Sequence, residues 1–211
     1  MVFLLGHPVE HSLSPRMQNA AFAAAGLDWE YVLRDVLPEE LEAAVREVEY
    51  ANVTAPYKLD AAQILGSELP SVNTLARGRG FSTDAAILEA VGDVRAPAIV
   101  GGGGAAAAFR HALPDARVFS RRGEWPPDVS GADLVVHATP VRDEVLFELG
   151  GGQTLIDLPY PRTATADAAA LAGARVFDGL EVLVAQGAAS FELWTGSAAP
   201  IDAMRRAVGL T

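Results

Sequence analysis

Residues 97–109 read PAIVGGGGAAAAF, and this stretch decides the expected fold. Its first four residues resemble a buried strand, four glycines follow directly, and an alanine-rich helix comes next. A strand, a glycine turn and a helix in this order begin a nucleotide-binding βαβ unit. The segment fits G-x-G-x-x-A: Gly101 permits a tight turn, Gly103 lets the backbone approach a pyrophosphate, and Ala106 lets the helix pack closely on the strand. The alternative is a flexible glycine loop.

The next strand predicts the cofactor. The N-terminus of the helix offers free N–H groups to phosphates. Roughly 20 residues after the first glycine, enzymes that use NAD carry an acidic residue for the ribose hydroxyls. Here the chain has Ser120, Arg121 and Arg122, and two guanidinium groups suit a 2′-phosphate instead. The sequence therefore favours NADP over NAD. The alternative is a pair of solvent-exposed arginines, and Glu124 nearby could weaken the preference.

Strands and helices alternate on both sides of the glycine turn. Strand-like runs occur at 2–5, 31–36, 52–54, 117–119, 134–137, 154–158 and 175–177. This alternation predicts parallel βαβ units and an α/β fold. We expect two domains: residues 1–84 with 180–211, whose C-terminal helices return to the first domain, and a Rossmann-type domain of residues 85–179.

Three local patterns add detail to this organisation. Ser14 before Pro15 predicts a helix start, with Ser14 as the N-cap and Pro15 at the first helical position. The runs 72–76 and 80–82 predict a hairpin around Gly78. A further helix is expected over 85–91.

Composition excludes several classes of protein. The 211 residues carry 16 Lys+Arg against 27 Asp+Glu, a net charge of −11, which argues against a general affinity for nucleic-acid phosphates. The chain has no cysteine, and its four histidines show no close pairing, so we expect no disulfide, thiolate nucleophile or metal site. No stretch resembles a signal peptide or a membrane span. We therefore expect a cytoplasmic protein without nucleic-acid or membrane partners, and its oligomeric state stays open.

Short polar blocks follow one another in a distinctive order along the whole chain. In this order the sequence resembles the shikimate dehydrogenase family. The matching segments are GHP at 6–8, HSLSP at 11–15 with Asn19, NVT at 52–54, PYK at 56–58, VNTL at 72–75, TD at 83–84, GGGGA at 101–105, ATP at 138–140, Asp157 with YP at 160–161, QGA at 186–188, Phe191, and WTG at 194–196.

This resemblance implies NADP-dependent interconversion of 3-dehydroshikimate and shikimate in aromatic amino-acid biosynthesis, by an N-terminal α/β substrate-binding domain and a Rossmann-type domain. It implies Lys58 and Asp84 as the catalytic residues. The substrate-binding residues that it implies are Ser12, Ser14, Thr54, Asn73, Tyr160 and Gln186. The cofactor-binding residues are expected to be Gly101, Gly102, Gly103, Gly104, Ala105, Ser120, Arg121, Arg122 and Thr139.

The chemistry asks for the same residue types. Hydride transfer to a ketone leaves an alkoxide that needs a proton or a cation, while the nicotinamide supplies the hydride. Lys58 is the only lysine among the polar blocks, and Asp84 can orient it and balance its charge. A lysine is protonated at neutral pH unless it is buried, so Lys58 is expected to donate the proton or stabilise the alkoxide during reduction. It acts as the base in the reverse direction.

Each of these residues also has a purely structural interpretation. Asp84 could cap the helix that follows it, and Lys58 or Gln186 could be solvent-exposed side chains. Thr54 and Asn73 could hydrogen-bond only to loop backbone.

The chain is short for this family, and only residues 123–133 are left for the helix that normally covers part of the nucleotide site. Ser120 also stands where the family usually has an asparagine. Two other functions therefore stay open. One is a quinate or shikimate-like dehydrogenase that prefers NAD, and the other is a shikimate-binding protein without turnover.

Overall fold

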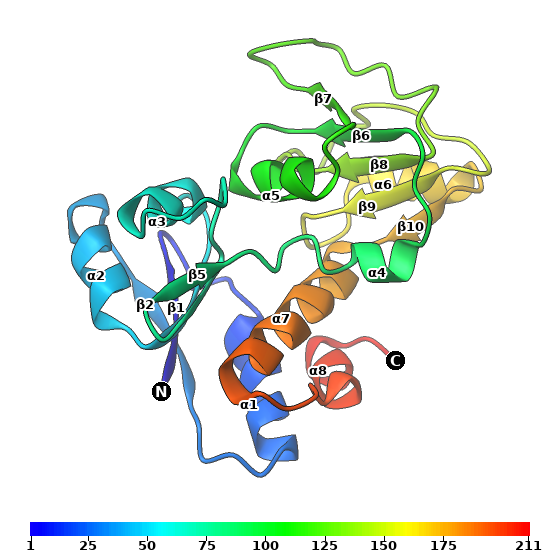
Figure 1. The fold of residues 1–211 in the computed structure, drawn as a ribbon. Helices are drawn as coiled ribbons and strands as arrows, with labels where there is room; N and C mark the ends of the chain where they lie inside the picture. The colour runs from blue at the N-terminus through cyan, green and yellow to red at the C-terminus, as the bar shows by residue number, and fades with distance from the viewer. The chain divides into compact units, whose positions relative to one another are not determined.

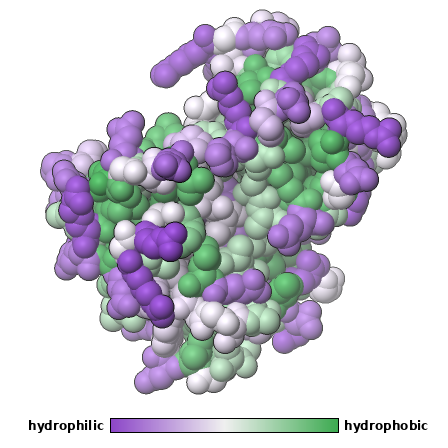
Figure 2. All heavy atoms as spheres, viewed as in Figure 1, coloured by the Kyte–Doolittle hydropathy of each residue, from purple (hydrophilic) through white to green (hydrophobic).

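The computed structural model describes residues 1–211, which divide into two compact units. The first unit comprises Met1–Ala86 with Leu183–Thr211, and the second comprises Ile87–Val182. Both are built on a five-stranded sheet with helices, so the expected α/β class is confirmed. No helix combines the length and the low polarity needed to cross a bilayer. Figure 2 shows one face of the molecule, on which hydrophilic side chains surround smaller apolar areas.

The sheet of the first unit is mixed, in the order β2-β1-β3-β4-β5. Its strands are β1 Val2–Gly6, β2 Tyr31–Asp35, β3 Tyr50–Val53, β4 Thr74–Ala76 and β5 Arg79–Phe81. Strand β1 pairs in parallel with β2 and β3, while β4 and β5 form an antiparallel hairpin. Arg77 and Gly78 connect the hairpin with φ angles of 51° and 74°, as a type I′ turn requires. The predicted hairpin around Gly78 is confirmed.

Helices cover both faces of this sheet (Figure 1). They are α1 Ser14–Ala24, the short 3₁₀ helix η1 Pro38–Glu40, α2 Leu41–Glu47, α3 Lys58–Ile64 and α7 Gly179–Thr195, whose residues from Leu183 onward belong to this unit. The last helix, α8 Ile201–Val208, packs against α1. Side chains alternate along β3: Ala51 and Val53 join the core beneath α2 and α3, whereas Asn52 faces α7. This alternation places a polar side chain against a helix that returns from the C-terminal part of the chain.

Two local predictions in this part of the chain are wrong. Ser14 is already the first residue of α1, and Leu13 holds the N-cap position. The hydroxyl of Ser12 accepts the Ser14 N–H at 3.2 Å, so the earlier serine satisfies this donor. The helix expected over 85–91 is limited to α4, Leu88–Val91, and Asp84 does not cap it, since its carboxylate binds the side chains of Lys58 and Asn73.

The sheet of the second unit is entirely parallel, in the order β10-β9-β8-β6-β7. Its strands are β6 Pro97–Val100, β7 Arg117–Phe119, β8 Leu134–His137, β9 Thr154–Asp157 and β10 Arg175–Phe177. In Figure 1, helix α5 (Gly104–Ala112) lies in front of this sheet and α6 (Ala164–Leu171) lies behind it. The first strand, β6, lies between the second and the third, so the topology reverses between β6 and β8. In such doubly wound sheets, ligands bind beyond the carboxyl ends of the strands at this reversal.

Asp133 fixes the start of β6 beside β8. Its carboxylate accepts N–H groups of Arg95 at 2.7 Å and Ala96 at 2.9 Å. Burial alone raises the pKa of Asp133, but these hydrogen bonds outweigh it and the net pKa is lowered. A carboxyl whose pKa is lowered by folding stabilises the fold above its unfolded pKa and loses this contribution as the pH falls. We expect Asp133→Asn to have a lower free energy of unfolding than the wild type at pH 7. The gap between the two free energies should become smaller as the pH falls, as urea titrations at several pH values would measure. A gap of the same size at acidic and neutral pH would contradict this role for Asp133.

Candidate functional site

One lysine and one aspartate form the centre of a site in the first unit. The Lys58 Nζ donates to Asp84 Oδ1 at 2.6 Å and to Oδ2 at 2.7 Å, and the two side chains are only 15% and 10% exposed. Lys58 is the only lysine of the entire chain, and every other cationic side chain is an arginine. An ammonium can exchange a proton in a reaction, whereas a guanidinium stays charged. Because the Lys58 side chain is mostly buried and bonded to Asp84, its interpretation as a solvent-exposed lysine is wrong.

The backbone around Lys58 is fixed from two sides. Lys58 begins α3 immediately after Tyr57, whose hydroxyl donates to the Val36 carbonyl at 2.7 Å. Burial, with the nearby charges of Asp35 and Glu39, raises the pKa of Tyr57 and keeps this donor protonated. The Lys58 carbonyl accepts the N–H of Val72 at 2.9 Å. A cation is unfavourable in the first turn of a helix, so Asp84 offsets a local electrostatic cost.

Asn73 orients the aspartate of this pair. Its Nδ2 donates to Asp84 Oδ1 at 3.0 Å and to Thr83 Oγ1 at 2.9 Å, while its Oδ1 accepts the Thr83 N–H at 2.7 Å. Gln186 on α7 lies at the edge of this network, with its Oε1 3.4 Å from Asn73 Nδ2. The structure thus brings four predicted residues into one connected group, and we call Lys58, Asp84, Asn73 and Gln186 the lysine cluster.

A buried polar layer supports the lysine cluster. Asn52 Nδ2 donates to Thr74 Oγ1 and Ser190 Oγ, each at 3.0 Å, and Asn52 Oδ1 accepts the Tyr31 hydroxyl at 2.9 Å. Such connected networks hold side chains in one arrangement because every alternative leaves a buried polar group unpaired. Sequence reasoning missed Ser190. Its position one helical turn after Gln186 was the available signal, since residues four apart share a helix face.

The other predicted substrate residues lie outside the lysine cluster. Ser12 and Ser14 stand together at the start of α1, and Thr54 follows β3 as a half-buried residue. No hydrogen bond joins these three to the cluster. Tyr160 belongs to the second unit, after β9, where its carbonyl accepts Arg142 Nη1 at 3.3 Å.

The second unit contains a cavity at the carboxyl ends of β6, β7 and β8, where the strand order reverses. Its volume is about 370 Å³. It is lined by Gly101, Gly102, Gly103, Ser120, Arg121, Trp125, Ala138, Thr139, Pro140 and Val141. A concave site at this position is the expected place for a nucleotide in a doubly wound sheet.

The glycine turn of this cavity fits a dinucleotide. Gly101 has φ +147°, and a Cβ there would lie 2.5 Å from the carbonyl oxygen of Ala138, so no other residue suits this position. A Cβ on Gly103 would meet only open space, which leaves room for a ligand to approach the backbone. Gly104 and Ala105 form the first turn of α5, whose N–H groups lack helical partners. The flexible-loop alternative is not supported by this geometry.

The predicted cofactor residues divide into three groups. Gly101 to Gly103, Ser120, Arg121 and Thr139 line the cavity. Gly104 and Ala105 begin the helix beside it. Arg122 is exposed and is not among the lining residues.

A buried histidine–aspartate pair lies behind one wall of the cavity, and sequence reasoning missed it. His137 Nδ1 is 2.7 Å from Asp157 Oδ1, and its Nε2 is 2.7 Å from Oγ1 of Thr139, a lining residue. Both members of the pair are fully buried. They are register partners at the ends of β8 and β9. Two polar residues ending adjacent buried parallel strands were the available signal.

Two family models match parts of this chain. Residues 4–75 match the model of the shikimate dehydrogenase substrate binding domain, and residues 179–208 match that of the shikimate 5'-dehydrogenase C-terminal domain. Shikimate dehydrogenase (NADP(+)) of Anaeromyxobacter dehalogenans strain 2CP-1 is 38% identical, over 97% of this chain and 94% of the relative. The chain belongs to the shikimate dehydrogenase family. The Methanopyrus kandleri member is 37% identical over 99% of this chain and 94% of its own.

Solved members of the shikimate dehydrogenase family share the fold. The Aquifex aeolicus enzyme superposes with a TM-score of 0.87 at 28% identity, covering 99% of this chain and 97% of that one. The Thermus thermophilus enzyme, crystallised with NADP(H) and shikimate, gives a TM-score of 0.83 at 30% identity, covering 98% of this chain and 97% of that one.

This chain is shorter than the curated relative with which it was aligned. The alignment with the Anaeromyxobacter dehalogenans enzyme spans 261 positions, whereas this chain has 211 residues, so it lacks roughly fifty residues of the relative. No helix forms in residues 120–133 between β7 and β8. This agrees with the expectation that too few residues were left for a covering helix.

Proposed function

We propose that this protein is an NADP-dependent shikimate dehydrogenase, which reversibly reduces 3-dehydroshikimate to shikimate in aromatic amino-acid biosynthesis. The observation that carries the proposal is the sole lysine of the chain, held by Asp84 within the lysine cluster. The relatives that cover nearly the whole chain bear the name shikimate dehydrogenase (NADP(+)).

Lys58 and Asp84 are the catalytic residues of this proposal. NADPH, when bound, supplies the hydride that converts the ketone carbon into a carbinol. The Lys58 ammonium stabilises the developing alkoxide and gives it a proton, and in the oxidation of shikimate the amine takes the hydroxyl proton. Asp84 holds the Lys58 Nζ in place through two hydrogen bonds, and Asn73 keeps the carboxylate in position.

The substrate is a cyclic hydroxy acid, and polar side chains of the first unit suit its hydroxyl and carboxylate groups. We assign this role to Ser12, Ser14, Thr54, Asn73 and Gln186, with Tyr160 serving the carboxylate. A site built from hydrogen-bonding groups rejects analogues that lack a partner, because its own polar groups are then left unpaired. Residues 1–84 with 180–211 would form the substrate-binding domain, and residues 85–179 the NADP-binding domain.

The cofactor residues follow from the cavity of the second unit. Gly101, Gly102 and Gly103, with Gly104 and Ala105 at the start of α5, offer backbone N–H groups to the pyrophosphate. Ser120, Arg121 and Arg122 serve the 2′-phosphate, and Thr139 faces the cofactor from the opposite wall.

Arg121 should set the preference for NADP. A guanidinium hydrogen-bonded to a phosphate contributes roughly 1.5–3 kcal/mol. We therefore expect Arg121→Ser to raise the KM for NADP about 10- to 100-fold and to leave the KM for NAD within about twofold. Arg122→Ser, a neighbour outside the cavity lining, should have a smaller effect on NADP. Equal losses with both cofactors in steady-state assays would contradict this role for Arg121.

A steady-state assay with shikimate and both nicotinamides tests the proposed function. We expect shikimate-dependent formation of NADPH, with slower reduction of NAD and slower oxidation of quinate. Faster turnover with NAD would favour the NAD-preferring dehydrogenase. Shikimate binding by calorimetry without cofactor binding or turnover would instead support a binding protein. We place the enzyme in the cytoplasm, where a biosynthetic reaction between dissolved metabolites and NADP takes place.

A further inference from the structure

We propose that Trp125 is a nucleotide-binding residue whose indole stacks on the adenine ring of the dinucleotide beside Arg121. This inference rests on the proposed function, because it assumes that NADP binds in the cavity of the second unit. Trp125 lines that cavity and is 37% exposed. It was not among the residues predicted from the sequence.

The chain brings Trp125 back to the end of β7. The segment after this strand closes on itself: Gly123 N–H donates to the Ser120 carbonyl at 2.9 Å, and Ser120 N–H donates to the Glu124 carbonyl at 3.1 Å. The residue after Glu124 therefore returns toward the cavity wall formed by Ser120 and Arg121. The Arg121 guanidinium lies over the Trp125 ring, with its carbon 5.8 Å from the ring centroid.

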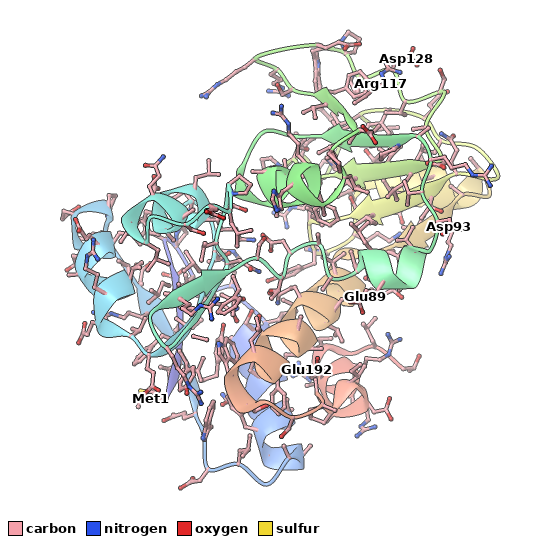
Figure 3. All side chains as sticks on the ribbon, viewed as in Figure 1. Met1, Glu89, Asp93, Arg117, Asp128 and Glu192 are labelled. Atoms are coloured by element: carbon pink, nitrogen blue, oxygen red, sulfur yellow. The ribbon has the colours of Figure 1, made fainter.

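The rest of this loop is anchored rather than free. Val129 is buried, and its carbonyl accepts the side-chain amide of Gln153 at 3.1 Å. Asp128 accepts the hydroxyl of Ser130 at 2.7 Å and its N–H at 3.2 Å, and these bonds lower the pKa of Asp128, with Arg117 adding to the effect. Figure 3 labels Asp128 and Arg117 at this edge of the unit. An anchored loop can hold an aromatic ring ready for a ligand at little entropic cost.

The position within the sheet points to the adenosine half of the ligand. The pyrophosphate belongs at the glycine turn, and the adenosine ribose belongs at the end of the next strand, β7. Trp125 lies beside the residues that follow β7, so the ring it meets is adenine. Adenine offers a flat π-face, and an indole and a guanidinium both stack on such a face.

The segment between β7 and β8 offers few other groups that could contact the adenine. No helix stands between β7 and β8 to cover the nucleotide, and the remaining lining on this side consists of Ser120 and Arg121 with the glycine turn. Trp125 is the one large apolar surface that the cavity lining offers to a base. In this proposal the indole of Trp125 covers the adenine, which no helix between β7 and β8 covers.

Fluorescence tests the contact without relying on turnover. Trp125 is the only tryptophan of the second unit, since Trp29 and Trp194 belong to the first. We expect NADPH to quench tryptophan emission in the wild type and in the matched control Trp29→Phe, whose ring packs on Phe22 and Tyr50. In Trp125→Leu most of this quenching should disappear. Quenching that persists unchanged in Trp125→Leu would contradict the proposal.

Calorimetry with adenosine 2′,5′-bisphosphate, which has no nicotinamide, isolates the adenosine half. We expect Trp125→Leu to weaken its binding about 5- to 50-fold, and Trp125→Phe, which keeps an aromatic face, to recover most of the affinity. Binding of nicotinamide mononucleotide should be unchanged.

Equal affinity of the wild type and Trp125→Leu for adenosine 2′,5′-bisphosphate overturns the role of Trp125 alone. Failure of the wild type to bind NADPH or the bisphosphate overturns the proposed function, and this inference with it. Circular dichroism should show the same folded content in all variants, because Trp125 lies outside the sheet.

Discussion

Lys58→Ala should lower kcat for the oxidation of shikimate by NADP by about 10²- to 10⁴-fold, the range for removal of a positioned acid or base. The KM for shikimate should change far less, because the residues proposed to bind the substrate, among them Asn73 and Gln186, are unchanged in this variant. The physical reason is that no other lysine exists in the chain to replace this ammonium. Steady-state kinetics of NADPH formation, with the folded state checked by circular dichroism, measure the effect.

Two further variants separate charge from proton transfer. Lys58→Arg keeps the positive charge but cannot readily give up a proton, so it should stay nearly as slow as Lys58→Ala. Asp84→Asn leaves the ammonium with a weaker partner and should reduce kcat less than loss of the lysine itself. If Lys58→Ala or Lys58→Arg kept more than about half of the wild-type kcat, Lys58 would not be the proton-transferring residue.

His137→Leu should lower the free energy of unfolding by about 1–3 kcal/mol, the usual effect of leaving a buried hydrogen-bonding group without its partner. Leucine keeps apolar volume at the end of β8 but leaves the Asp157 carboxylate without its imidazole partner. The Thr163 hydroxyl and N–H, at 3.0 Å and 3.2 Å, still bind Asp157, so the loss should fall in the lower half of this range. Urea unfolding followed by circular dichroism measures it.

A double-mutant cycle decides whether the two residues act together. The variant that combines His137→Leu with Asp157→Asn should be destabilised by clearly less than the sum of the two single changes, because the hydrogen bond between the two side chains can be lost only once. The same His137→Leu change should raise the KM for NADP, since His137 holds the Thr139 hydroxyl at the cavity wall. If the loss of unfolding free energy in the double variant equalled the sum of the two single losses, His137 and Asp157 would not be coupled.

Much of this structure was predictable because its strongest signals are local. The glycine turn at 101–104 predicts a strand before it and a helix after it, and the structure has β6 and α5 at these places. Arg77 and Gly78 adopt the backbone angles that a two-residue hairpin requires. The pairing of Lys58 with Asp84 was expected from chemistry and from family resemblance, and the structure places the two groups in contact.

The features that sequence reasoning missed depend on contacts between distant segments. Ser190 matters only because α7 passes over Asn52, which is 138 positions away in the chain. His137 meets Asp157 only because β8 and β9 are paired in one register. Trp125 reaches the cavity only because the short segment after β7 turns back. The error at Ser14 is local, because the helix begins one residue earlier than expected and Leu13 holds the N-cap position.

The single lysine permits one direct test of the whole account. In protein labelled with ¹⁵N-lysine, the spectrum of side-chain amines contains one Nζ resonance, that of Lys58. We predict that saturating shikimate shifts this resonance in the wild type, and that Asp84→Asn moves it in the absence of substrate. An Nζ resonance that stays in place while calorimetry shows shikimate bound would contradict the claim that this amine meets the substrate.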